Sequence, residues 1–205
     1  MLAILLTSIA YGHNFSENEV PSKVVLEKIK KGLPVEYDHC IINGNLDLDE
    51  LNRSSINDSP KLVISSPIII TESTINGLID FSNAVFIETV TFGKTKVNGE
   101  VNFHASEFNK SVMFSGSELG DDAEFTESIF RNSSAFDEVD FGRDAKFSSS
   151  VFNGIARFSQ SKFHEMADFE DAIFYKNVHF DKCQFSNAYF EGASFIEHLD
   201  LNKTT

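Results

Sequence analysis

The chain has 205 residues, of which 31 are acidic and 17 basic, and its formal net charge is −14. Such an acidic balance argues against direct binding to nucleic acid. Phenylalanine occurs 21 times and tryptophan is absent, which favours a stacked core whose rings have no polar atom to satisfy.

Residues 1–12 are the one targeting candidate. Leu2 to Leu6 begin a short apolar run that ends in small residues near Ala10 and Gly12, as in the tail of a secretory signal peptide. The run lacks a positively charged start and is too short to span a bilayer, so no membrane span is expected in the mature chain. A truncated signal and an ordinary apolar N-terminus both stay open, and a secreted or extracytoplasmic location is favoured over a cytoplasmic one.

Residues 13–61 are expected to form a cap on the N-terminal end of the fold. Ser22 is expected to N-cap a short helix that runs to about Lys31 and stops at Gly32. Ile42 and Leu48 are predicted to be the first inward residues. The polar stretch 49–61 is predicted to be a loop or an irregular first coil.

Residues 62–201 carry an internal repeat. A Phe or an aliphatic residue recurs at intervals that alternate between five and six, a spacing that fits neither a helix nor a half-buried strand. A small or β-branched residue, such as Ala84, Val101 or Ser106, precedes most of these positions by two. Each unit therefore sends one small and one large side chain inward. The large positions are Ile64, Ile70, Ile75, Phe81, Phe86, Phe92, Val97, Phe103, Phe108, Phe114, Leu119, Phe125, Phe130, Phe136, Phe141, Phe147, Phe152, Phe158, Phe163, Phe169, Phe174, Phe180, Phe185, Phe190 and Phe195.

These units resemble the pentapeptide-repeat proteins, whose unit is a small residue, a polar residue, a central Phe or Leu and two polar residues. Ala188 to Gly192 and Ala193 to Glu197 match that unit closely. The resemblance implies an all-β fold, a right-handed quadrilateral β-helix with four short sides per coil and the central residues stacked inside.

The chain departs from the family pattern by one extra residue in every second unit. Every fourth centre is then 22 residues further on, as from Phe81 to Phe103, which predicts four columns of stacked residues. The step from Phe185 to Phe190 is only five, so the last coil loses one extra residue. About six coils are expected, with Leu199 and Leu201 as the final inward pair and 202–205 as a polar tail.

Catalytic or metal constellations are not recognisable from spacing. Cys40 and Cys183 are predicted to be buried small residues near opposite ends, too far apart for a disulfide. Four histidines, His104, His164, His179 and His198, are expected to point outward on different coils. We therefore expect no enzymatic activity, no cofactor and no metal. The acidic runs 121–124 and 137–140 are interpreted as solvated turns.

The function expected is a structural or protein-interaction scaffold. The alternative comes from the resemblance, since some family members mimic duplex DNA and occupy the DNA site of type II topoisomerases. This chain has the sign of charge that such a mimic needs, but Lys146, Arg157 and Lys162 interrupt the acidic surface.

One side of the predicted square is unusually apolar on its outside. The other three sides are expected to carry mostly polar residues at equivalent positions. We call this side's outward residues the apolar strip. It indicates either an interface for a protein partner or for self-association, or a plain solvent face on which Val and Ile reflect only strand propensity. The apolar strip comprises Val85, Ile87, Ile129, Val151, Ile173 and Tyr175.

Overall fold

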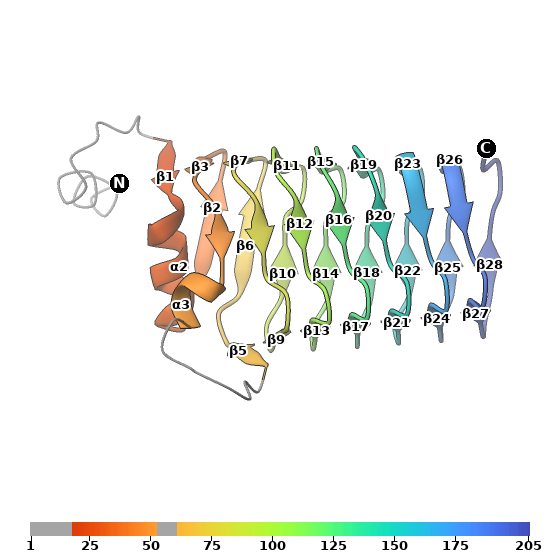
Figure 1. Ribbon diagram of the computed structural model, residues 1–205, viewed down its shortest axis with the longest axis horizontal. Helices are drawn as coiled ribbons and strands as arrows, with labels where there is room; N and C mark the ends of the chain where they lie inside the picture. Colours follow the sequence, from red (N-terminus) through yellow and green to blue (C-terminus); the bar gives the residue numbers. More distant parts are fainter. Residues whose placement is uncertain (1–17, 53–60) are drawn as a thin grey trace.

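The structure is a computed structural model that describes residues 18–52 and 61–205. They form a parallel β-solenoid of about 8 turns with little helix. The strands follow one another along a straight rod, with the N-terminal helices at one end and the C-terminus at the other (Figure 1). The predicted fold class, a pentapeptide-repeat β-helix with an N-terminal helical cap, is confirmed.

Three parallel sheets form the four sides of the rod. The thirteen-stranded sheet provides two sides, which β23 joins by pairing with both β19 and β20. Its strands are β1 (Glu19–Pro21), β3 (Ile41–Asn43), β7 (Thr74–Asn76), β11 (Lys96–Val97), β15 (Glu118–Leu119), β19 (Asp140–Phe141), β23 (Lys162–Asp168), β26 (Gln184–Tyr189), β20 (Ala145–Lys146), β16 (Ala123–Glu124), β12 (Val101–Asn102), β8 (Ile79–Asp80) and β4 (Leu46–Asp47).

The other two sides are separate sheets. The eight-stranded sheet contains β2 (Val35–Asp38), β6 (Ile68–Thr71), β10 (Val90–Thr91), β14 (Val112–Met113), β18 (Ser134–Ala135), β22 (Ala156–Arg157), β25 (Val178–His179) and β28 (Leu199–Asp200). The seven-stranded sheet contains β5 (Leu62–Ile64), β9 (Ala84–Phe86), β13 (Glu107–Phe108), β17 (Ile129–Phe130), β21 (Val151–Phe152), β24 (Ile173–Phe174) and β27 (Ser194–Phe195).

The four predicted columns of large residues form the core. Strand pairing sets the residues of each column above one another, as in Phe108 with Phe130 and Phe130 with Phe152. The rings of Phe130 and Phe152 are nearly parallel, at 6°, with centroids 4.5 Å apart. Rings of columns on opposite sides of the square meet edge to face across the core, as Phe136 and Phe147 do at 80°. Offset stacks and edge contacts are the favourable aromatic geometries, so both directions of the core are well packed.

Two kinds of corner alternate around the square. At the five-residue corners the chain turns through a left-handed residue, for example Asn83 at φ 53° and Lys94 at φ 51°. Inside these corners, buried hydroxyls donate to carbonyls of the previous coil. Ser106 Oγ donates to Phe81 O at 2.7 Å, and Thr95 Oγ1 donates to Ile70 O at 3.0 Å. Where the small residue at such a corner is Ser or Thr, it therefore also satisfies a buried backbone carbonyl.

The C-terminal coil differs from the coils before it. The register between β23 and β26 shifts between Phe163 and Met166, as the predicted loss of one residue requires. Phe185, Phe190 and Phe195 are only partly buried, because no further described coil covers them. The prediction of a final inward pair is half wrong: Leu199 packs against the core, but Leu201 is exposed.

The N-terminal cap is the helix α2 (Ser22–Lys30), which buries Val25, Leu26 and Ile29. The prediction for its start is wrong. Ser22 lies inside the helix and is buried, the N-cap is Pro21, and no side chain caps the helix. The stop is as predicted, since Gly32 follows the C-cap with a φ of 64°.

Beneath this helix the capping region already contains a coil of the solenoid. The strands β2, β3 and β4 pair in register with β6, β7 and β8. Ile42 and Leu48 point into the core as expected, and Leu46 is buried with them. This coil explains why the solenoid has more turns than the six expected.

The first coil is longer than those of the repeat. Asn43 of the first coil bonds to Asn76, which is 33 residues further along the chain. Asn76 in turn bonds to Asn98, only 22 residues further along, which is the spacing of the repeat. The additional residues include the short helix α3 (Asp49–Asn52), at the start of the stretch predicted to be a loop or an irregular first coil. The part of that stretch from 53 to 60 lies outside the described residues.

Candidate interaction surface

The apolar strip lies on the outer face of the seven-stranded sheet. Parallel pairing places Val85, Ile129, Val151 and Ile173 in a single column, interrupted only by Glu107 between Val85 and Ile129. These four aliphatic side chains are half-buried by their neighbours on the same face. Val63 on β5 continues the column at one end and is 57% exposed.

A second outward column runs beside the first, one residue after each core position. Ile87 is 40% exposed and Tyr175 is 45% exposed, and Ile196 continues this column with 61% exposure. Asn109, Arg131 and Asn153 stand between them. The two columns together give a face that is most apolar towards its two ends.

Charge is almost absent from these two columns. Along the described strands, Glu107 and Arg131 are their only charged side chains, and they pair with each other, with Arg131 Nε 2.6 Å from Glu107 Oε1. Arg131 is half exposed, so the pair adds little stability. Its effect is to leave the face neutral on a chain whose net charge is −14.

The other sides are less uniformly polar than the sequence indicated. On the eight-stranded sheet Ile69, Met113 and Ala135 occupy outward positions, with Thr91 between Ile69 and Met113, and Met113 is 43% exposed. That run ends at Arg157, which follows Ala135 in the column. The apolar strip is therefore distinguished by its length along the rod and not by apolar character alone.

The two sides of the thirteen-stranded sheet carry ladders of ion pairs. Each pair joins side chains of neighbouring coils, as in Lys96 Nζ to Glu118 Oε2 at 2.9 Å. The acidic run 121–124 is bound in this way by Arg143 and Lys146. Across the rod, eight cations of the repeat lie within 4.0 Å of a carboxylate: Lys94, Lys96, Arg131, Arg143, Lys146, Arg157, Lys162 and Lys176.

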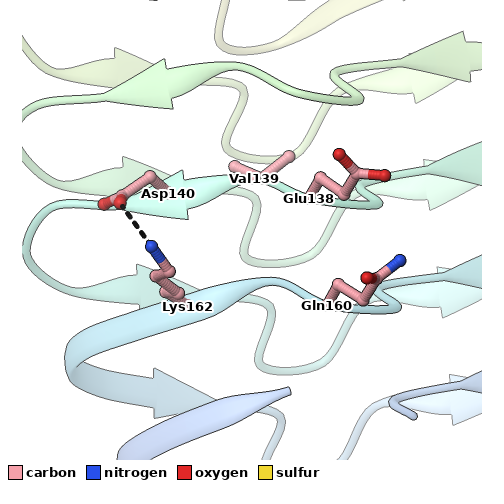
Figure 2. Close-up of a pocket in the computed structure, with 5 residues that line it drawn as sticks. All are labelled: Glu138, Val139, Asp140, Gln160 and Lys162. Carbon is pink, nitrogen blue, oxygen red and sulfur yellow. Dashed lines mark ion pairs between the residues drawn. The ribbon is translucent and has the colours of Figure 1, made fainter. Parts of the chain in front are cut away.

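A shallow pocket lies at one five-residue corner (Figure 2). Glu138, Val139 and Asp140 of one coil and Gln160 and Lys162 of the next line it, and its volume is about 300 Å³. Lys162 Nζ lies 4.0 Å from Asp140 Oδ2, so these two side chains are already paired.

The same pocket coincides with a break in a ladder of hydroxyls. Val139 occupies a position where Ser117 and Ser161 carry a hydroxyl that donates to the preceding coil. Asp140 is paired with Lys162, and Val139 carries no polar atom, so Glu138 is the one carboxylate of this pocket outside an ion pair, and we assign the pocket no chemistry.

Few titratable groups of the described residues are perturbed. Burial, followed by the nearby carboxylates Asp122 and Asp80, raises the pKa of Glu100. Burial raises the pKa of the Cys183 thiol to about 12, and its Sγ donates to Phe158 O. Both cysteines are free; Cys183 is buried as predicted, whereas Cys40 is only partly buried. A thiol with a raised pKa has little thiolate at neutral pH, so Cys183 serves as a core residue.

A family model described as pentapeptide repeats (9 copies) matches residues 81–129, 125–173, 136–184 and 169–205. The chain belongs to the pentapeptide-repeat family. No curated protein and no solved structure matches it. The architecture of this pentapeptide-repeat protein is that of a repeat scaffold, whose regular sides carry long columns of side chains.

Membrane insertion through a helix has no support in the part of this pentapeptide-repeat protein that the structure describes. Neither α2 nor α3 has the length and the apolar character needed to cross a bilayer. The predicted signal in residues 1–12 lies outside the described residues.

One cluster of side chains in the described residues was not predicted from the sequence. The structure brings His179 and Asp181 of one coil together with Asp200 of the next coil. Considered singly, the histidines are only outward residues on separate coils. The repeat itself holds the signal that reveals the cluster, because residues one coil apart become neighbours in the ladder, as His179 and Asp200 do.

Proposed function

We propose that this protein is a non-catalytic interaction scaffold that associates through the apolar strip, and that the surface covering the strip is the strip of a second copy. The observation that carries this proposal is the neutral apolar face on an otherwise acidic rod. A large exposed apolar patch marks an interface more often than a plain solvent face.

Self-association is favoured by the position of the one charged pair. Glu107 on β13 and Arg131, which follows β17, lie side by side near the middle of the strip. A two-fold axis through this pair would set Glu107 of each copy near Arg131 of the other. An isologous dimer needs such a self-complementary surface, and neutral faces avoid the repulsion that the acidic sides would cause.

The test is the oligomeric state of the full chain over a range of concentrations, measured by sedimentation velocity. We expect a dimer that the double substitution Ile129→Lys with Val151→Lys converts to a monomer. Both side chains point away from the core, so the circular dichroism spectrum and the urea midpoint should change little.

A matched control adds the same two charges elsewhere. Asn102→Lys with Met113→Lys places lysines at equivalent outward positions on two other sides and should leave the dimer intact. A wild-type protein that remains monomeric at high concentration, or a control variant that dissociates as readily as the strip variant, would overturn the proposal.

The DNA-mimic hypothesis rests on the net charge of −14 and on the rod shape. The ion pairs weigh against it, because a mimic needs carboxylates that remain free for the DNA site of its target. A purified topoisomerase of type II decides the matter: inhibition of DNA supercoiling that weakens as salt rises would favour mimicry. If excess protein does not inhibit supercoiling at low salt, the scaffold hypothesis is favoured over the DNA-mimic hypothesis.

A further inference from the structure

A mixed nitrogen and oxygen cluster lies on the eight-stranded sheet, away from the apolar strip. His179 on β25 pairs in register with Asp200 on β28, and Asp181 follows two residues after His179. One potential ligand atom from each of the three residues lies within 4.8 Å of the others. Within the cluster, His179 Nδ1 lies 3.9 Å from Asp200 Oδ2.

We propose that His179, Asp181 and Asp200 bind a divalent transition-metal ion, for which Zn²⁺ is the best fit. Zinc takes imidazole nitrogen and carboxylate oxygen ligands, and three protein ligands with one water complete its usual four positions. Tetrahedral ligand atoms with bonds of about 2.0–2.1 Å stand roughly 3.3 Å apart. Small side-chain rotations therefore bring the three atoms from their present spacing to that of a bound ion.

Each carboxylate is already oriented by a donor of its own. Ser159 Oγ lies 2.5 Å from Asp181 Oδ1, and the backbone N–H of Asn202 donates to Asp200 Oδ1 at 3.0 Å. The second oxygen of Asp200 is the one that faces the imidazole. Outer partners of this kind hold metal ligands in place and are a regular part of metal sites.

The surroundings distinguish this cluster from other pairs of histidine and acid in the described residues. His164 Nε2 meets only one carboxylate, Asp140, which also lies 4.0 Å from Lys162. His39 uses both ring nitrogens on different carboxylates, so Asp38 and Glu72 stand on opposite sides of the ring. Arg157 is the neighbour of His179 in the preceding coil. Its guanidinium pairs with Asp137 and not with a carboxylate of the cluster.

The experiment is zinc binding by equilibrium dialysis of the full chain after treatment with a chelator. We expect wild type to bind one Zn²⁺ more than His179→Ala does, whereas His164→Ala binds as much as wild type. The comparison between variants removes any background binding elsewhere. Asp200→Asn should also abolish the site, and Ser159→Ala should weaken it by about 10–100-fold, as removal of an outer partner does.

A second readout is structural and does not depend on affinity alone. A zinc ion would join β25 to β28, so hydrogen exchange at the amides of β28 should slow, by roughly 100-fold at a free zinc concentration 100 times the Kd. Zinc binding that is equal in His179→Ala and wild type, or no binding by a folded wild-type chain, overturns the proposal. Equal binding of Ca²⁺ and Zn²⁺ also overturns it, because Ca²⁺ takes oxygen ligands and needs no imidazole.

Discussion

The two ends of the solenoid differ in how completely the core is covered. At the N-terminal end α2 covers the coil and buries Val25, Leu26 and Ile29 against it. At the C-terminal end of the described chain, Phe185, Phe190 and Phe195 remain only partly buried, although they occupy the same columns as the fully buried rings before them. Burial of a repeat residue therefore depends on whether another element lies on its coil, and not on the repeat unit alone.

Among single substitutions, we expect the largest loss of stability for a core residue midway between the two ends. Phe136 is fully buried, with Phe114 stacked 5.4 Å on one side and Phe158 stacked 5.0 Å on the other. Phe136→Ala should lower the free energy of unfolding by about 3–5 kcal/mol through lost burial and a cavity. Urea denaturation measures this, and a loss below about 1 kcal/mol would contradict the stacked core.

Removing a contact of the N-terminal cap should have a similar or somewhat smaller effect. Leu26 is 2% exposed and packs in the core cluster beneath α2. We expect Leu26→Ala to cost about 2–5 kcal/mol in urea denaturation. Glu27→Ala, at the exposed neighbouring position, is the control and should change stability by no more than about 0.5 kcal/mol. Similar losses in both variants would show that the helix does not cap the core through its apolar face.

A Phe→Ala substitution at the C-terminal end should lower the free energy of unfolding by less than one in the middle of the rod. Phe195 stacks on Phe174 at 5.1 Å, but it is only partly buried. Phe195→Ala should cost about 1–2 kcal/mol, since part of the ring is already in water. Hydrogen exchange should accelerate in β27 and β28 and stay unchanged in the middle coils. A loss as large as that of Phe136→Ala would mean that the two regions do not differ in packing.

The smallest expected effect is on the pH dependence of stability, and it comes from an exposed histidine of the N-terminal coil. A hydrogen bond to Asp38, followed by the negative charges of Asp38 and Glu72, raises the pKa of His39 above its ordinary value. A raised pKa in the folded chain means that the protonated ring stabilises the fold below about pH 6.5, the ordinary value, and that this contribution is lost as pH rises through the folded pKa.

An NMR titration of the His39 ring measures this shift. Asp38→Asn removes the main cause and should lower the midpoint, and His39→Gln should flatten the pH dependence of the urea midpoint in that window. A His39 midpoint at or below the ordinary value in wild type would contradict the ion-pair geometry.

The columns of the core were predictable because strict spacing leaves few ways to stack the large residues. Once Phe81 and Phe103 are one coil apart, the positions between them follow, and the pairing of Phe108 with Phe130 confirms the register. The start of α2 was not predictable in this way. Ser22 has the chemistry of an N-cap, but tertiary packing buries it near Gly44, where a Cβ on the glycine would lie 2.6 Å from the Ser22 hydroxyl.

The repeat in the sequence by itself determined the family, the four-sided solenoid and which side chains point outward, because the period of the large residues sets the register of every coil. Only the tertiary structure decided which outward residues meet. It paired Glu107 with Arg131, brought Asp200 to His179 and left Phe195 partly uncovered. These outcomes depend on rotamers, on corner geometry and on the elements that cover each end of the stack, none of which a periodic pattern specifies.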